Sequence, residues 1–306
     1  MTTNPKPRIV VVGSANMDLV VRTKHIPKPG ETVLGGEFFQ LPGGKGANQA
    51  VAAARLGGDV TFIGCVGQDA FGDALLAGLV RDGIDVKHVQ RVKDIASGVA
   101  LIGVDSDGQN SIIVAPGANA ALNSKDIDAA EKTIESADSV VAQFEVSQEA
   151  VTRAMHIAAL NGLHTILNPA PYQYGDKLSM SLLSSIEVLV PNEHEAAAML
   201  GIRPGTRVDY RAAAEALLRY GAGSVIITLG DQGCIVADEN GAREIPPVRV
   251  TSVDSTAAGD CFCGALAVAM AEGKSLDDAA RFASAAAAIS VTRMGAQASM
   301  PIRSEV

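Results

Sequence analysis

The residues best suited to chemistry lie near the C-terminal end, in the run DSTAAGD at residues 254–260. Small residues lead into a Gly-Asp pair, and an Ala-rich helical pattern begins there. The first turn of a helix has unpaired backbone N–H groups and carries the positive end of the helix dipole, so it can bind an anion. A carboxylate at such a site suggests a base, Asp260, that takes a proton from a hydroxyl group attacking a phosphate. We expect the N–H groups of Ala257, Ala258 and Gly259 to hold the transferring phosphoryl group while the dipole keeps Asp260 ionised.

A second Gly-rich run, GGKGAN at residues 43–48, opens another helical pattern. Glycines allow the backbone to approach a ligand closely, and Lys45 and Asn48 can donate hydrogen bonds, so the run fits a hydroxyl-binding loop. The alternative is an ordinary Gly-rich turn that binds no ligand. The GxxxxGK[ST] frame of a Walker A loop is absent.

Polar side chains also follow several apolar runs that read as strands. Ligands of open α/β sheets bind at the carboxyl ends of the strands, so these side chains predict one shared cleft. They are Asn16, Asp18, Glu145, Asn168, Asn192 and the segment 228–230. A dinucleotide site after the first strand is improbable, because the GxGxxG frame is missing.

The apolar pattern alternates between short strands and helices over most of the 306 residues. This alternation predicts an α/β fold of three layers, α/β/α, with a mostly parallel central sheet. Helices are expected over 48–56, 69–81, 124–136 (with a Ser cap), 147–161, 193–200, 210–220, 259–272 and 275–291. Strands are expected over 8–13, 60–66, 139–146, 164–167, 186–190, 224–229, 234–237 and 248–250.

Two segments interrupt this rhythm, at about 16–44 and 97–116. The second contains alternating residues on both sides of Asp107-Gly108, which predicts a hairpin. Together they suggest a small β-sheet lid on a single domain of residues 1–306. An apolar lid face could pair with a second copy, so a homodimer is expected.

Net charge, cysteine spacing and the length of apolar runs limit the partners and the location expected for this protein. The net charge of -9 argues against a nucleic-acid or anionic-membrane partner, although a nest of N–H groups can still bind a nucleotide. The four cysteines show no disulfide or zinc spacing and are expected in the core, although Cys261 and Cys263 follow a helix start and could be reactive. Neither a signal peptide nor a run of transmembrane length is evident, which favours a soluble, cytoplasmic protein.

The motifs taken together resemble one family. They are NMD at 16–18, GGKGAN at 43–48, PNEHE at 191–195, TLGDQG at 228–233 and DSTAAGD at 254–260. In this order they are similar to the phosphofructokinase-B-type (ribokinase) family of carbohydrate and nucleoside kinases. The resemblance runs from about residue 8 to residue 301, and its two Gly-rich signatures are highly specific.

The resemblance implies a function and a set of sites. It implies ATP-dependent phosphorylation of D-ribose at O5, with Asp260 as base, Mg²⁺ on the phosphates and K⁺ as a monovalent activator. The implied sugar ligands are Asn16, Asp18, Gly44, Lys45, Asn48, Glu145 and Asp260. The implied nucleotide contacts are Asn192, Glu195, Thr228, Gly230, Gly233, Gly259 and Ser284, with Mg²⁺ reached through water near Asn192 and Glu195. The implied cation site, mostly of backbone carbonyls, comprises Asp254, Thr256, Ser290, Arg293, Gly295 and Ser299.

Two other functions remain open at this level. The first is a sister kinase for deoxyribose, fructose, a keto-deoxy sugar acid or a nucleoside. The second is a sugar sensor without catalysis on the same scaffold. Asp18 and Glu145 favour a polyhydroxyl substrate, and an intact Asp260 speaks against the sensor.

Overall fold

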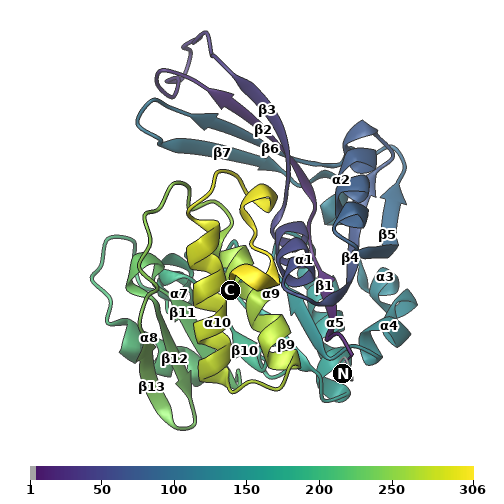
Figure 1. Cartoon of the computed structure of the whole chain (residues 1–306), viewed down its shortest axis with the longest axis vertical. Coiled ribbons are helices and arrows are strands. Elements are labelled where there is room, and N and C mark those ends of the chain that lie inside the picture. Colours follow the sequence, from purple (N-terminus) through teal and green to yellow (C-terminus); the bar gives the residue numbers. More distant parts are fainter. Residues whose placement is uncertain (1–4) are drawn as a thin grey trace.

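A computed structural model describes residues 5–306 and contains a nine-stranded sheet that forms the middle layer (Figure 1). The strand order is β13-β12-β11-β10-β9-β8-β1-β4-β5, and every pair from β10–β11 to β4–β5 is parallel. Only β12 and β13 add to the edge in antiparallel fashion. The strands are β1 (Arg8–Val12), β4 (Asp59–Gly67), β5 (Asp85–Val92), β8 (Ser139–Ala142), β9 (His164–Leu167), β10 (Val188–Leu189), β11 (Ser224–Thr228), β12 (Cys234–Asp238) and β13 (Gly241–Ile245).

Helices cover both faces of this sheet, because a parallel strand buried on two sides must find an apolar partner on each. One core contains residues of α1 (Lys45–Arg55), α2 (Ala70–Arg81), α9 (Ala258–Ala271) and α10 (Leu276–Ser290). The other core is formed by the remaining helices. They are α3 (Ser124–Ala129), α4 (Glu131–Glu135), α5 (Gln148–Leu160), α6 (Met180–Leu183), α7 (Glu193–Met199) and α8 (Tyr210–Leu218). The three-layer prediction is therefore confirmed.

A separate sheet of four strands rises above the main body in Figure 1. Its order is β3-β2-β6-β7, from β3 (Phe38–Gly43), β2 (Asn16–Arg22), β6 (Gly98–Val104) and β7 (Asn110–Ala115). The expected hairpin is present, since β6 and β7 pair antiparallel across the turn at Asp107-Gly108. This lid sheet is thus built from the two segments that interrupt the α/β rhythm.

Several sequence-based boundaries need correction. Residues 248–250 do not form a strand, and the last strand is instead β13, which was not predicted. The helix expected over 124–136 is broken at Ala130, and its cap is Asn123 rather than a serine. Strand β5 was also missed, because its valines come at every third position and none of its residues is buried on the sheet edge.

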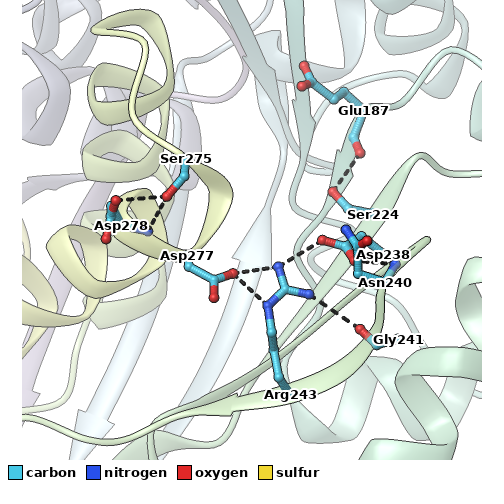
Figure 2. Close-up of polar contacts among 9 residues, drawn as sticks. All are labelled: Glu187, Ser224, Asp238, Asn240, Gly241, Arg243, Ser275, Asp277 and Asp278. Atoms are coloured by element: carbon cyan, nitrogen blue, oxygen red, sulfur yellow. Dashed lines mark hydrogen bonds and ion pairs between the residues drawn. The ribbon is translucent and has the colours of Figure 1, made fainter.

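The edge hairpin β12–β13 is tied to α10 by one guanidinium group (Figure 2). Arg243 donates from Nε to Asp277 Oδ1 at 2.7 Å and from Nη2 to Asp238 Oδ2 at 2.7 Å. Both carboxylates raise the pKa of Arg243. Planar guanidinium groups suit such forked contacts, so Arg243 sets the spacing between the hairpin and the N-terminus of α10.

All four cysteines are buried and unpaired within residues 5–306, as expected for core thiols. Burial raises the pKa of Cys261 to about 12, which disfavours the reactive thiolate. None of the helices in the described part of the chain combines the length and the apolar character needed to cross a membrane.

Candidate active site

The N-terminus of α9 has the unusual backbone that the DSTAAGD run suggested. Its N-cap residue, Ala257, lies in the left-handed region with φ 60 and ψ 16. A residue other than glycine pays roughly 1–2 kcal/mol for this conformation, so the surrounding structure must hold it there. The turn leads through Ala258 and Gly259 directly into Asp260, in the first turn of the helix.

The glycines around α1 serve close packing within the protein. A Cβ on Gly44, which has φ 90, would lie 2.6 Å from the backbone nitrogen of Asn16. A Cβ on Gly46 would lie 2.6 Å from the nitrogen of Ser14. The Gly-rich run therefore lets the start of α1 contact the segment after β1 backbone to backbone, and the expectation that the same run binds a ligand stays a prediction. This contact places Lys45 and Asn48 beside the start of β2.

Asp260 is buried, with 6% of its surface exposed. Its Oδ2 accepts a hydrogen bond from Asn48 Nδ2 at 2.9 Å, and its Oδ1 accepts one from Gln49 Nε2 at 3.2 Å. Burial raises the pKa of Asp260, while the charge of Lys45 and these hydrogen bonds oppose that rise. Desolvation is the largest of these effects, so the pKa of Asp260 lies above that of an exposed aspartate, and the expectation that the helix dipole keeps the group ionised stays a prediction.

Glu145, after strand β8, joins three elements of the site. Within residues 5–306, its three hydrogen bonds all reach Oε2 and come from Ser14 Oγ (2.6 Å), Asn16 Nδ2 (3.3 Å) and the backbone N–H of Lys45 (3.1 Å). Oε2 is thus occupied by protein donors that fix the end of β1, the start of β2 and the start of α1 relative to one another.

Asp18, on the lid strand β2, completes a group of three carboxylates. Burial raises its pKa to about 7, and the neighbouring charges of Glu145 and Asp260 contribute. Its Oδ2 lies so close to Gly43 that a Cβ there would be 2.2 Å away. Perturbed titratable groups that share a cleft mark functional sites, and here the lid carries one of them.

A cavity of about 680 Å³ lies on the other side of the α9 N-terminus. This volume falls in the range of small-molecule sites. It is lined by five of the seven residues expected to contact nucleotide, namely Thr228, Gly230, Gly233, Gly259 and Ser284. Ala258 and Ser255 also line it, and so do Val248 and Val250 from the segment wrongly expected to be a strand.

The other two expected nucleotide residues lie beside the cavity and form the start of α7. Asn192 and Glu195 make a capping box, with Asn192 Oδ1 accepting from Glu195 N at 2.9 Å and Glu195 Oε2 accepting from Asn192 N at 2.9 Å. Asn192 also forms a bridge with Thr228 of the cavity wall. Burial raises the pKa of Glu195.

The six residues of the expected cation site come from two neighbouring segments. Asp254 accepts hydrogen bonds from the N–H of Thr256 (2.9 Å) and from the N–H of Gly295 (2.8 Å), which joins the two segments. The hydroxyl groups of Ser290 and Ser299 donate to the carbonyls of nearby alanines, and Arg293 pairs with Glu305. Among residues 5–306, His, Cys, Asp and Glu side chains form no metal-binding cluster of three or more.

Sequence reasoning missed three buried amides at the site. Gln49 directly follows Asn48, and Gln143 directly follows strand β8. Both side chains are fully buried. Asn119 accepts from Ala15 N at 3.0 Å and donates to Asn16 Oδ1 at 2.7 Å. In the sequence these three residues are only neighbours of the expected site residues or of a strand. Nothing in the local pattern distinguishes them from ordinary core or turn residues.

Comparisons with known proteins agree with this geometry. Residues 6–303 match the model of the pfkB family carbohydrate kinases. The chain is 42% identical to a ribokinase of Haemophilus influenzae over 297 residues (97% of this chain, 96% of the other). It is 37% identical to a deoxyribokinase of Salmonella typhimurium (96% and 95%). An Arabidopsis thaliana ribokinase solved with ribose and ATP superposes with a TM-score of 0.90 at 34% identity (98% and 97%). The chain belongs to the pfkB family of carbohydrate kinases.

Proposed function

We propose that the protein transfers the γ-phosphoryl group of ATP to O5 of D-ribose, giving ribose 5-phosphate and ADP. One observation carries the proposal. Asp260 lies between two half-sites, because its carboxylate contacts Asn48 of the Gly-rich run while the preceding residue, Gly259, lines the 680 Å³ cavity. A hydroxyl group held against Asp260 would face a phosphate held in that cavity.

The sugar half-site offers groups that match hydroxyl groups. Asn48 Oδ1 is buried without a hydrogen-bond partner among residues 5–306, an arrangement that costs about 1–3 kcal/mol unless a ligand donates to it. Glu145 receives its protein donors on Oε2, which leaves Oε1 for a sugar hydroxyl. Asn16 and Lys45 donate to Glu145, Gly44 lies against Asn16, and the charges of Glu145 and Asp260 act on Asp18, so these four residues would complete the ribose contacts.

In the reaction, Asp260 accepts the proton of the 5-hydroxyl group as O5 attacks the γ-phosphorus. The bond between that phosphorus and the bridging oxygen of ADP breaks, and ADP leaves. The N–H groups of Ala257, Ala258 and Gly259 would stabilise the charge on the transferring group, because they open α9 and two of these residues, Ala258 and Gly259, line the cavity. Positioning and electrostatics are the main sources of catalysis in phosphoryl transfer.

ATP would occupy the cavity along Thr228, Gly230, Gly233 and Ser284. Mg²⁺ keeps much of its hydration in proteins and would reach the phosphates through water near Asn192 and Glu195, where an acidic side chain is buried. When bound, it would neutralise charge on the phosphates.

A monovalent cation such as K⁺ would lie beside the anion site. The segments that carry Asp254, Thr256, Ser290, Arg293, Gly295 and Ser299 are held together by Asp254. Because the serine hydroxyl groups and Arg293 have protein partners, the backbone carbonyls of these residues are the available ligands.

The lid favours a homodimer of single-domain subunits. All six residues of β7 are exposed, and Leu101 and Ile113, which pair across β6 and β7, are 50% and 66% exposed. An exposed apolar sheet is a common pairing surface between copies of a chain.

The test is ADP release by purified protein from Mg-ATP with a panel of sugars and nucleosides, with and without K⁺. Ribose should be turned over best, and NMR should locate the phosphate on C5. Strong turnover of a nucleoside with none of ribose would overturn the proposal, and silence on every substrate under K⁺ would favour a sugar sensor. Deoxyribose is the second candidate, because a deoxyribokinase is 37% identical to this chain.

A further inference from the structure

A chain of hydrogen-bonded side-chain amides contacts Asp260, and none of its members lines the 680 Å³ cavity. Gln49 Nε2 donates to Asp260 Oδ1 at 3.2 Å and lies 3.3 Å from Asn168 Oδ1, which also accepts from it. Gln143 Nε2 donates to Gln49 Oε1 at 2.6 Å, and Asn168 Nδ2 donates to the carbonyl of Val190 at 2.8 Å. The chain therefore runs from the ends of strands β8, β9 and β10 to one oxygen of Asp260.

Gln49 and Gln143 cannot bind the substrates directly, because neither has any exposed surface. Asn168 is 8% exposed, and among the described residues its side chain is linked to Asp260 through Gln49. Their only route to the reaction is through the Asp260 carboxylate.

The chain is maintained at a cost to stability. Gln143 Oε1 is buried without a hydrogen-bond partner among residues 5–306, and a Cβ on Gly13 would lie 2.1 Å from it. An unpaired buried acceptor costs about 1–3 kcal/mol, and an apolar side chain would avoid that cost. An amide at position 143 is explained by its N–H group, which donates a hydrogen bond to Gln49 and fixes that side chain.

A neutral amide is also the appropriate donor for a base. Lysine or arginine in place of Gln49 would pair with the carboxylate and depress its pKa strongly, whereas an amide orients it while leaving its charge for the substrate proton.

We propose that Gln49, held by Gln143 and Asn168, is a positioning residue that fixes the orientation of the Asp260 carboxylate for proton transfer. This inference rests on the proposed function, since it assumes that Asp260 is the base for a sugar hydroxyl. It adds residues that act through Asp260 and bind neither substrate.

The test compares Gln49→Met and Gln143→Met with wild type and with a matched control, Gln148→Met, at the exposed first residue of α5. Steady-state kinetics with ribose over pH 5–9, ribose binding by calorimetry and thermal unfolding are measured for each. Gln49→Met should lower kcat by about 10–100-fold, with ribose affinity within about twofold of wild type, the size of effect seen for groups that orient a reactive partner. The hydrogen bond from Gln49 lowers the pKa of Asp260 in wild type, so its loss should raise that pKa and move the acid limb of kcat to higher pH.

Gln143 contacts Gln49 rather than Asp260, so Gln143→Met tests the same inference if Gln49→Met does not fold. It should also lower kcat, but by a smaller factor. Its Tm should change little, because the substitution removes the unpaired acceptor Gln143 Oε1 and leaves Gln49 Oε1 unpaired in its place. Gln148→Met should match wild type.

Wild-type kcat and an unmoved acid limb in a folded Gln49→Met or Gln143→Met protein would overturn the inference and leave the proposed function standing. A loss of kcat that only parallels a loss of stability, with the acid limb unmoved, would also overturn it. The proposed function itself fails, and this inference with it, if wild type does not phosphorylate ribose or if Asp260→Asn is fully active.

Discussion

Asn48 Nδ2 lies 2.9 Å from Asp260 Oδ2, although 212 positions separate the two residues in sequence. Each belongs to a different Gly-rich run and stands in the first turns of a different helix, α1 or α9. The contact joins the proposed sugar half-site to the proposed phosphate half-site, so the roles of both runs can be tested together.

Removal of the base should separate binding from chemistry. Asp260→Asn keeps the size of the side chain and should lower kcat by about 10²–10⁴-fold, the usual contribution of general base catalysis, while ribose binding persists. Steady-state kinetics and calorimetry would measure the two effects. Asp59→Asn, at an exposed position, serves as the control. Turnover near wild type in Asp260→Asn would exclude this residue as the base.

The left-handed backbone at Ala257 should tolerate only small residues. Ala257→Gly should retain activity, because glycine adopts φ 60 freely, whereas Ala257→Val should lose about 10²–10³-fold in kcat as the N–H groups move away from the phosphoryl group. Circular dichroism would verify that both variants fold. Equal kcat values in the two variants would show that the turn does not act on the transition state.

Ribose affinity should depend on pH through Asp18. With a pKa of about 7, this carboxyl group is protonated below neutrality and ionised above it. An ionised carboxylate only accepts hydrogen bonds, and sugar hydroxyl groups can donate them, so the KM for ribose should fall as pH rises through about 7. In Asp18→Asn that dependence should disappear, and a KM that varies equally in both proteins would rule out Asp18 as its source.

The same group has a stability signature in the sugar-free protein. A carboxyl group whose folded pKa is raised contributes stability that is present below its unfolded pKa and is lost as pH rises through the folded value. Asp18→Asn should therefore raise Tm relative to wild type at pH 8, by about 2–4 °C or more, and much less near pH 4. Scanning calorimetry at the two pH values tests this, and the same Tm difference at both would contradict it.

Asp254 should control the response to K⁺. Asp254→Ala removes the acceptor that joins Thr256 to Gly295, so activation by K⁺ should weaken or vanish while activity without K⁺ changes less. Titration of KCl against NaCl at constant ionic strength provides the measurement. An unchanged K⁺ response would place the cation site elsewhere.

The lid should mediate self-association. Ile113→Asp introduces a charge at the most exposed large apolar residue of β7, and it should shift the protein toward monomers. Light scattering coupled to gel filtration would report the mass. Leu160→Asp, at an even more exposed apolar position on α5, should leave it unchanged. A mass that is the same in wild type and Ile113→Asp would argue against the lid as the interface.

Local sequence patterns determined most of the fold and the location of the site. Alternating apolar runs predicted the three layers, and the rule that ligands bind at the carboxyl ends of parallel strands brought Asn16, Glu145 and Asn192 to one region. Such features follow from short-range periodicity and turn chemistry, which adjacent residues encode. The edge strand β5 was missed because it lacks the alternation of a strand, whereas residues 248–250 were wrongly expected to be a strand because Val248-Arg249-Val250 has that alternation.

Only the tertiary structure decided how these groups act on one another. The contact of Gln49 with Asp260, the grouping of Asp18 with Glu145 and Asp260, and the raised pKa values all depend on which strands lie side by side and how deeply each side chain is buried. Strand order joins residues more than 100 positions apart, and desolvation is a property of the packed whole. A linear pattern can therefore name the reacting groups, whereas their acidity and orientation arise only when the chain is folded.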